Sequence, residues 1–366
     1  MNKFPVPGTK EANEFLRRWN EANSKGKHEL CYEFQGSYER ACHIVVEYRN
    51  YKPPKDIPTS ESRELNVNLP PVNLLKYKAP TRKRGDEEIA ILHTSDGHAG
   101  KITKSFNKDV YRSRMAQMFK AVMILVNLHR NMYPIRRLLI FNTGDNIQGE
   151  NPHQGSKIGE VEMGARDQVH KLAAPMWNDV LGSFSQEFEQ VQFEGVPGNH
   201  GHEKLAPETS SYDLLLYDVL EAGIGTRVKN ITINTHEEWY AIIEELNIKM
   251  FLFHGWGIPC HQGVPYFALD KKLKSWHMQF GGFRYAFSGH FHKSFTHEIS
   301  SVLEHFSCST LASDDNWALQ KLGISSYPSQ NMFGLHPRHG ITWRYNLIVD
   351  DKYLPALPQT QALGND

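Results

Sequence analysis

The apolar residues of this chain gather in short runs rather than in an alternating pattern. Five runs of three or four residues occur between residues 89 and 287, and each leads into a polar or glycine-containing turn. Such runs are typical of strands that are buried on both faces of a sheet. They span residues 89–92, 138–141, 191–193, 250–253 and 285–287. In residues 341–349, by contrast, apolar and polar residues do alternate. This pattern predicts a terminal strand with Trp343, Tyr345 and Leu347 on one face.

Helix-like stretches separate these strands, at residues 110–130, 160–184 and 211–220. Strands that alternate with helices predict an α/β fold. In open α/β sheets, ligands bind at the loops that leave the carboxyl ends of strands. We therefore expect the loops after the five buried strands to converge on one rim of the molecule.

The first 52 residues predict a separate helical module. Thr9 can cap a first helix with one apolar face, and residues 29–34 suit a short second helix. Ser37 can cap a third helix that runs to residue 48. A turn at Gln35 and Gly36 separates the second helix from the third.

This order of helix, glycine-containing turn and helix resembles the DNA-binding modules of the helix-turn-helix class. The third helix would expose Tyr38, Arg40 and His43, with Arg49 and Lys52 beyond them for phosphate contacts. The alternative is a three-helix packing or oligomerisation element, in which these are ordinary surface residues. The sequence leaves both interpretations open.

Residues 53–88 contain six prolines with polar residues between them, and they predict an extended linker or a strap. Arg82, Lys83 and Arg84 close this segment, either as a solvated charge run or as a nucleic-acid contact near the predicted rim. We assign residues 89–350 to a catalytic domain and residues 351–366 to a C-terminal tail. A tail of this kind is expected to fray.

Composition places the chain among ordinary globular proteins, because 40% of its 366 residues are hydrophobic and 22% are charged. Its four cysteines have no paired spacing, which favours a reducing compartment. No apolar run approaches the roughly 20 residues of a membrane helix, and residues 1–5 do not begin a signal peptide. We therefore expect a cytoplasmic protein without a membrane partner.

The formal net charge is zero, but it is unevenly distributed. Residues 1–85 carry 16 basic and 10 acidic side chains, whereas the rest of the chain carries 25 basic and 31 acidic ones. A basic N-terminal part attached to an acidic catalytic domain is the simplest division. The basic part would attract phosphate groups.

Five short motifs follow the five buried strands in order. Each contributes one or two side chains that can hold a divalent cation through oxygen or imidazole nitrogen. Any one of them alone would be a weak signal, but their ordered recurrence predicts a metal site. The motifs are Asp96-Gly97-His98, Gly144-Asp145-Asn146, Gly198-Asn199-His200, His254-Gly255 and Gly289-His290-Phe291-His292.

This set resembles the calcineurin-like metallophosphoesterase superfamily over roughly residues 88–310. The resemblance implies a β-sandwich flanked by helices, in four layers (αββα), and a centre of two divalent metal ions. It places Asp96, His98 and His292 on the first ion, Asn199, His254 and His290 on the second, and Asp145 between them. It places His200 beside the scissile phosphate, as a general acid or a stabiliser of the transition state.

Such a centre explains the residue types. Two bridged cations lower the pKa of a shared water, and the resulting hydroxide attacks phosphorus in line. An imidazole can supply the proton that the leaving oxygen needs near neutral pH. Mixed carboxylate, amide and imidazole ligands favour manganese and leave iron, zinc or magnesium open.

Two departures from the pattern narrow the class of enzyme. The protein Ser/Thr phosphatases of this superfamily carry a second acid and an Arg where this chain has Gln148 and Gly149, and an acid where it has Gly201. The opening motif from His93 to His98 instead resembles the SbcD-type DNA repair nucleases. His202 would take over part of the role of the acid missing at Gly201.

Two further segments are candidates for substrate contact. The polar loop at residues 148–154 contains His153. Residues 266–276 interleave Lys271, Lys272 and Lys274 with aromatic residues, which suits a phosphate backbone with stacked bases. An amphipathic helix that covers the sheet explains the same segment equally well.

Together these features favour a two-metal phosphodiesterase, and within that class a DNA endo- or exonuclease. One alternative is a phosphohydrolase of small nucleotides or other phosphoesters. Another is a DNA-binding regulatory protein with a non-catalytic metal site. A homodimer is compatible with the sequence, and whether an ATPase partner exists, as in SbcD-type enzymes, stays open.

Overall fold

The computed structural model describes residues 4–7, 9–34, 37–51, 86–150, 158–202, 207, 209–260, 265–314 and 327–350. The chain divides into two compact units, residues 1–78 and 79–366. The predicted linker, the basic triplet at residues 82–84, the loop at 151–157 and the C-terminal tail lie largely or wholly outside the described residues.

The first unit contains the three predicted helices, α1 (Lys10–Glu21), α2 (Ser24–Glu33) and α3 (Tyr38–Asn50). The side chains of Thr9 and Ser37 cap α1 and α3, as predicted, and Asn23 caps α2. The helices enclose a small core of their own. Its buried members are Ala12, Phe15, Trp19, Leu30, Cys31, Ala41, Val45 and Tyr48.

The outward face of α3 carries both basic and acidic side chains. Arg40 and His43 are exposed, but so are Glu39 and Glu47 on the same helix. Tyr38 is 38% exposed, and its ring packs against Trp19. The helices are present as predicted, whereas a role for them in DNA binding stays a prediction.

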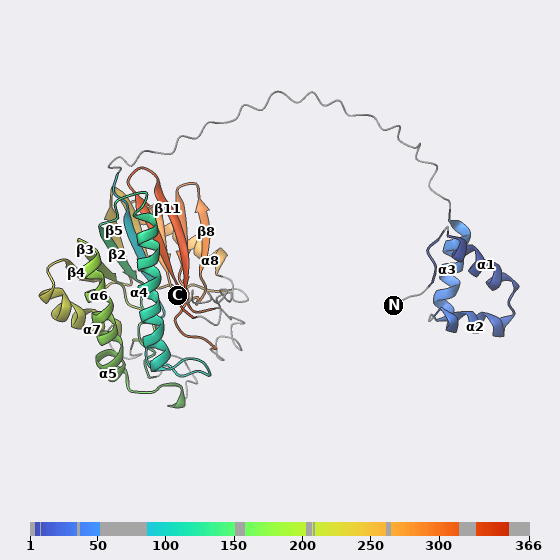
Figure 1. Ribbon diagram of the computed structural model, residues 1–366, viewed down its shortest axis with the longest axis horizontal. Coiled ribbons are helices and arrows are strands. Elements are labelled where there is room, and N and C mark those ends of the chain that lie inside the picture. The colour runs from blue at the N-terminus through green and yellow to red at the C-terminus, as the bar shows by residue number, and fades with distance from the viewer. Residues whose placement is uncertain are drawn as a thin grey trace, which may run out of the picture. The chain divides into compact units, whose positions relative to one another are not determined.

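The second unit is built on two β-sheets (Figure 1). The six-stranded sheet has the order β11-β10-β1-β2-β3-β4. Strands β1 to β4 are parallel to one another, and β10 runs antiparallel to both of its neighbours, β1 and β11. Its strands are β1 (Ile89–Thr94), β2 (Arg137–Asn142), β3 (Gln190–Gly195), β4 (Ile231–Thr235), β10 (Ser329–His336) and β11 (Gly340–Ile348).

The five-stranded sheet has the order β5-β6-β7-β9-β8, in which β6, β7 and β9 are parallel. Its strands are β5 (Tyr240–Glu245), β6 (Ile248–Phe253), β7 (Tyr285–Ser288), β8 (Phe295–Ser300) and β9 (Leu303–Ser307). The five buried runs that predict strands are therefore β1, β2, β3, β6 and β7. The alternating segment near the end is β11.

Helices cover the outer faces of both sheets. On the six-stranded sheet lie four helices: α4 (Lys108–His129), α5 (Ala165–Asp167), α6 (Ala174–Glu187) and α7 (Tyr212–Leu220). Three short segments adjoin them in the chain, namely the 3₁₀ helix η1 (Ile158–Glu160) and the π-helices η2 (Gln168–Ala173) and η3 (Glu221–Gly225). On the five-stranded sheet lies α8 (Tyr266–Gln279). Figure 1 shows α6 and α7 on one side of the sheets and α8 on the other. The predicted four-layer αββα fold is confirmed.

Strand β1 shows why its sequence lacks alternation. Ala90 and Leu92 face the helices of the first layer, while Ile89 and Ile91 face the second sheet. All six residues of the strand are buried. Because both faces need apolar side chains, a continuous apolar run is the expected pattern.

The structure corrects one sequence expectation and bears on one alternative that the sequence left open. The single helix predicted over residues 160–184 is interrupted, because residues 161–164 are not helical and the π-helix η2 lies between α5 and α6. The basic and aromatic segment at residues 266–276 is the amphipathic helix α8. It buries Leu269 and Leu273 in the core, which matches the alternative to a nucleic-acid surface.

The described helices include none that is both long and apolar enough to cross a lipid bilayer.

Candidate metal centre

The loops that carry the predicted ligands all leave the carboxyl ends of strands. Asp96 and His98 follow β1, Asp145 follows β2, and Asn199 follows β3. In the second sheet, His254 follows β6, and His290 and His292 follow β7. Because these strands lie in two sheets packed face to face, the loops meet at one edge of the sandwich, where their side chains form overlapping clusters.

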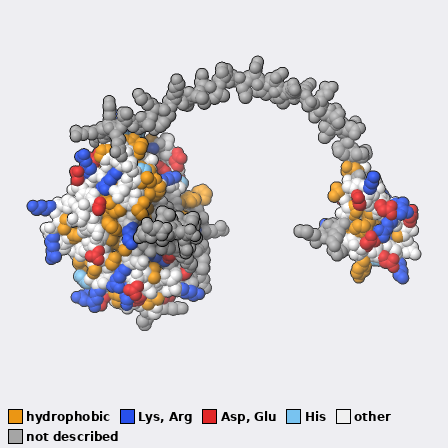
Figure 2. All heavy atoms as spheres, viewed as in Figure 1, with side chains coloured by type: hydrophobic (Ala, Val, Ile, Leu, Met, Phe, Trp, Pro, Cys, Tyr) orange, Lys and Arg blue, Asp and Glu red, His pale blue; other side chains and the backbone are white. Residues whose placement is uncertain are grey.

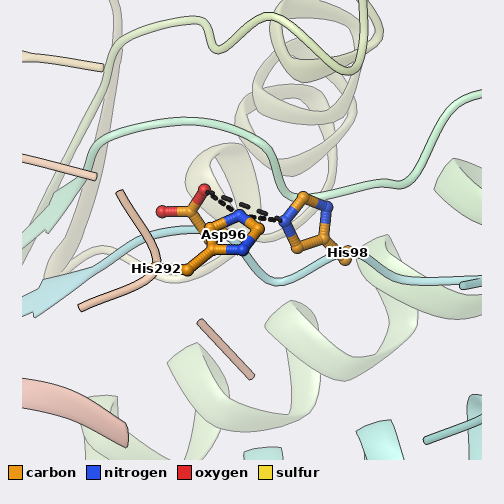
Figure 3. A group of neighbouring side chains, drawn as sticks. All are labelled: Asp96, His98 and His292. Atoms are coloured by element: carbon orange, nitrogen blue, oxygen red, sulfur yellow. Dashed lines mark hydrogen bonds and ion pairs between the residues drawn. The ribbon is translucent and has the colours of Figure 1, made fainter. Parts of the chain in front are cut away.

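The first cluster contains Asp96, His98 and His292 (Figure 3). The Nε2 atoms of His98 and His292 lie 3.0 Å apart. The Oδ1 atom of Asp96 lies 3.3 Å from Nε2 of His292 and 3.8 Å from Nε2 of His98. Ligand atoms that are each about 2.1 Å from one ion lie roughly 3.0–3.5 Å from one another. The spacing therefore suits a single divalent cation.

The second cluster contains Asp145, His254 and His290, whose ligand atoms lie within 4.8 Å of one another. The Nε2 atom of His254 lies 3.1 Å from Asp145 Oδ2 and 3.0 Å from Asn199 Oδ1. Its other ring nitrogen, Nδ1, donates to the carbonyl of Thr143 at 2.6 Å. This hydrogen bond leaves Nε2 as the nitrogen that can bind a metal.

The protonation states of Asp96, Asp145, His98 and His290 also suit cation binding. Burial would raise the pKa values of Asp96 and Asp145, but the imidazoles around them hold both below the usual range. Burial lowers the pKa of His290 to about 3 and that of His98 well below its usual value. The carboxylates are therefore charged and these two imidazoles neutral near pH 7.

Three buried polar atoms in the clusters have no hydrogen-bond partner among the described residues: Asp96 Oδ1, Asp145 Oδ2 and His98 Nδ1. The two carboxylate oxygens are the atoms that face the imidazole nitrogens. In the metal-free protein the neighbouring imidazoles lower the cost of burying these charged oxygens, and a divalent cation at each position would take over that role. The residues present therefore fit a pair of divalent cations that share Asp145.

The backbone at these positions is unusual. Five of the seven predicted ligands have a positive φ: 50° at Asp96, 47° at His98, 55° at Asp145, 69° at His290 and 54° at His292. This left-handed conformation is uncommon for residues other than glycine, and it clusters at functional sites. It indicates that the loops are shaped to aim side chains inward at some cost in local strain.

The loops after β2 and β3 pack with their backbones in contact. Gly144 has a φ of 84°, and a Cβ atom there would lie 2.3 Å from the backbone nitrogen of Gly198. No side chain fits in that space. The glycines at the start of these two motifs therefore allow Asp145 and Asn199 to approach the same point.

His200 lies beside both clusters and is 6% exposed. Its backbone N–H donates to Asp145 Oδ1 at 2.7 Å, and its Nε2 atom is 3.8 Å from Asp145 Oδ2. Its Nδ1 atom lies 3.2 Å from the carbonyl of Gln148, which can accept its proton. That carbonyl can orient the imidazole, and a contribution from His202 stays a prediction. The ligand atoms of His98, Asp145 and His200 also lie within 4.8 Å of one another, so distance alone permits His200 as a ligand.

Sequence reasoning missed the residues that support the loops. Asp213 on α7 and Gln168 on η2 are fully buried polar residues that hydrogen-bond the backbone near the ligands. The Thr143 carbonyl fixes His254. None of them belongs to a short motif, because each acts through a contact made between distant segments. The Ser211-x-Asp213 start of a helix is the only local sign of Asp213.

Some predicted contacts lie outside the described residues. They include His153 in the polar loop after β2 and the basic triplet before β1, so both stay predictions.

The sequence matches no protein-family profile and no curated protein. Among solved structures, it is similar to a predicted phosphoesterase from Streptococcus pneumoniae, with 10% identity over 72% of this chain and 99% of that one, at a TM-score of 0.29. It is also similar to vacuolar protein sorting 29 from Cryptosporidium parvum, with 13% identity over 69% of this chain and 87% of that one, at a TM-score of 0.34. A third similar structure is a 5′-nucleotidase from Candida albicans, with 12% identity over 73% of this chain and 52% of that one, at a TM-score of 0.34. Likenesses this distant assign no activity, and the resemblance to SbcD-type nucleases stays a prediction.

Proposed function

We propose that this protein is a metal-dependent phosphodiesterase and that its substrate is DNA. The observation that carries the proposal is the pair of buried clusters joined at Asp145, in which carboxylate oxygens face imidazole nitrogens. Two divalent cations bound there would supply an activated water for attack on phosphorus and would neutralise charge on the phosphoryl oxygens. Manganese is the metal that we would test first.

The chain itself supplies the ligands, their orientation and a proton donor. Asp96, His98 and His292 would hold one cation, Asn199, His254 and His290 the other, and Asp145 both. The Gln148 carbonyl fixes the ring of His200 so that Nε2 is directed toward the bridging carboxylate. A proton held on that nitrogen is placed to reach a leaving oxygen.

One feature supports a phosphodiester rather than a phosphomonoester as the substrate, and a second supports a nucleic acid among phosphodiesters. Gln148 and Gly149 stand where an enzyme for phosphomonoesters would use an acid and an Arg. Trp256 follows the predicted ligand His254 by two residues and is 69% exposed. An exposed indole so near a ligand along the chain suits stacking on a base.

The test is cleavage of end-labelled single- and double-stranded DNA with added Mn²⁺, beside a chromogenic phosphodiester in the same buffer. Asp145→Asn is the control, because it removes the carboxylate shared by both clusters, and we expect it to abolish turnover. Products formed only by the unmutated protein would support the nuclease, and their lengths would separate exo from endo action.

Other results would redirect the proposal. Intact DNA with hydrolysis of the chromogenic diester would favour a small nucleotide or other phosphoester as substrate. No turnover of either substrate, together with salt-sensitive DNA binding, would favour a regulatory protein with a non-catalytic metal site. Equal activity of Asp145→Asn would overturn the metal centre itself.

A further inference from the structure

Asp213 is a buried carboxylate outside the predicted ligand set. It lies in the first turn of α7 and is 0% exposed. Among the described residues, no Lys or Arg forms an ion pair with it. A buried charge without a cation persists only where hydrogen bonds compensate for the lost hydration. Its surroundings therefore show what it is there to hold.

Four donors surround this carboxylate. Its Oδ2 atom accepts from the backbone N–H groups of Asp145 and Gly198, both at 2.9 Å. Its Oδ1 atom accepts from the backbone N–H of Asn146 at 2.9 Å and from the Asn146 side chain at 3.0 Å. One oxygen thus joins the loop of the bridging residue to the loop that carries Asn199 and His200.

The position of α7 also accounts for Gly201. A Cβ atom at residue 201 would lie 3.1 Å from the backbone nitrogen of Asp213 and 3.3 Å from that of Tyr212. The carbonyl of Gly201 accepts from the N–H of Tyr212 at 2.9 Å. A side chain at residue 201 would therefore crowd the start of α7, and in this chain a carboxylate reaches the loops from α7 instead.

We infer that Asp213 is a positioning residue that holds the Asp145 and Gly198 loops in the arrangement that binds the metal pair. The inference rests on the proposed metal centre. Asp213 itself touches neither substrate nor metal. It acts on backbone amides, and through them it sets the distance between Asp145 and the ligands of the second cluster.

The test is Asp213→Asn, which keeps the size of the side chain but turns an NH₂ group toward backbone N–H donors. Asp218→Asn is the matched control, since Asp218 is exposed on the same helix. Mn²⁺ titration followed by electron paramagnetic resonance reports both affinity and the magnetic coupling of a metal pair. Loss of a residue that orients metal ligands typically weakens metal binding by 10–100-fold.

We expect Asp213→Asn to remain folded, to bind Mn²⁺ about 10–100-fold more weakly, and to lose the coupled signal at stoichiometric metal. Its kcat should recover at saturating Mn²⁺, which a general loss of structure would not allow. Metal binding equal to that of Asp218→Asn would overturn the inference.

A second measurement applies if the variant does not fold. Hydrogen exchange at the amides of Asp145, Asn146 and Gly198 in the unmutated, metal-free protein should be slow, because Asp213 accepts from all three. Fast exchange at these amides would overturn the inference. An unmutated protein that binds no Mn²⁺ would end the metal proposal, and its amide exchange would still decide whether Asp213 holds the loops.

Discussion

Buried histidines serve two purposes in this molecule, and the partner of each ring nitrogen separates them. His254 donates from Nδ1 to a carbonyl and aims Nε2 at acidic and amide oxygens. His93 and His305 instead contact the hydroxyls of Thr143 and Ser288, and burial lowers the pKa of each to about 3. They are neutral polar members of the core, whereas His254 faces the carboxylate and the amide of two other predicted ligands.

The pKa of His254 predicts how metal binding depends on pH. Burial would lower this pKa, but the Asp145 carboxylate raises it to about 9 in the metal-free protein. Only the neutral imidazole binds metal, so a proton must leave below pH 9. The other carboxylate and imidazole ligands with shifted pKa values are already in their binding states at pH 7.

Apparent Mn²⁺ affinity should therefore rise by up to about tenfold per pH unit from pH 7 to 9 and then level off. Calorimetry in buffers of different ionisation enthalpy would count the released protons, and we expect about one at pH 7.5. Affinity that does not change over this range would show that His254 is not the titrating ligand.

The assignment of His200 as a proton donor predicts a selective loss. His200→Ala should retain two metals per chain while the rate falls by about 10²-fold or more, because only proton transfer is removed. Metal content by mass spectrometry, measured beside kcat, checks both parts. A variant that has lost its metals would make His200 a ligand, which the distances in the site also permit.

At the scale of elements, α7 supports the metal loops although it carries no predicted ligand. Ser211 caps the helix by accepting from the N–H of Asp213 at 3.2 Å. Asp213 in turn holds the loops after β2 and β3. The start of this helix is therefore the place where helix stability and site geometry are coupled.

Ser211→Ala tests that coupling. Loss of the cap should lower the free energy of unfolding by about 1 kcal/mol and also weaken Mn²⁺ binding. Asn107→Ala is the matched control, because Asn107 caps α4 through two backbone amides at 3.0 Å and α4 carries no predicted ligand. We expect the control to lose similar stability in thermal unfolding without a change in metal affinity. Equal metal affinity in both variants would contradict the coupling.

At the scale of the whole molecule, the two units have different compositions and separate cores. All three clusters of the larger core belong to residues 79–366, whereas the three-helix unit has its own. On the face shown in Figure 2, side chains of both charges are interspersed with hydrophobic ones. On this face, an attraction for DNA would therefore depend on local groups.

Deletion of residues 1–52 separates DNA capture from chemistry. If the helical unit binds DNA, the shortened protein should bind duplex about tenfold or more weakly at fixed salt, because a linked second module adds avidity. Its hydrolysis of a small chromogenic diester should be unchanged, since every predicted ligand lies in the other unit. Fluorescence anisotropy gives the affinity, and an unchanged value would contradict the DNA-binding role.

The sequence by itself determined the strands that are buried on both faces and the ligand motifs that follow them. Burial on both faces imposes a local pattern of apolar residues, which is why 89–92 and 138–141 can be recognised as β1 and β2. Cap residues such as Thr9 and Ser37 are equally local, since they bond amides three residues away. These features need no knowledge of the rest of the fold.

The tertiary structure decided what depends on distant segments meeting. Strand β10 is fully buried, yet it begins with Ser329, Gln330 and Asn331, and backbone carbonyls of neighbouring segments accept from the side chains of Gln330 and Asn331. Asp213 has no motif, because its four donors come from loops that only folding brings to α7. The predicted ligands can be recognised from short sequence motifs. The groups that hold them in place cannot, because they act through contacts between segments far apart in the chain.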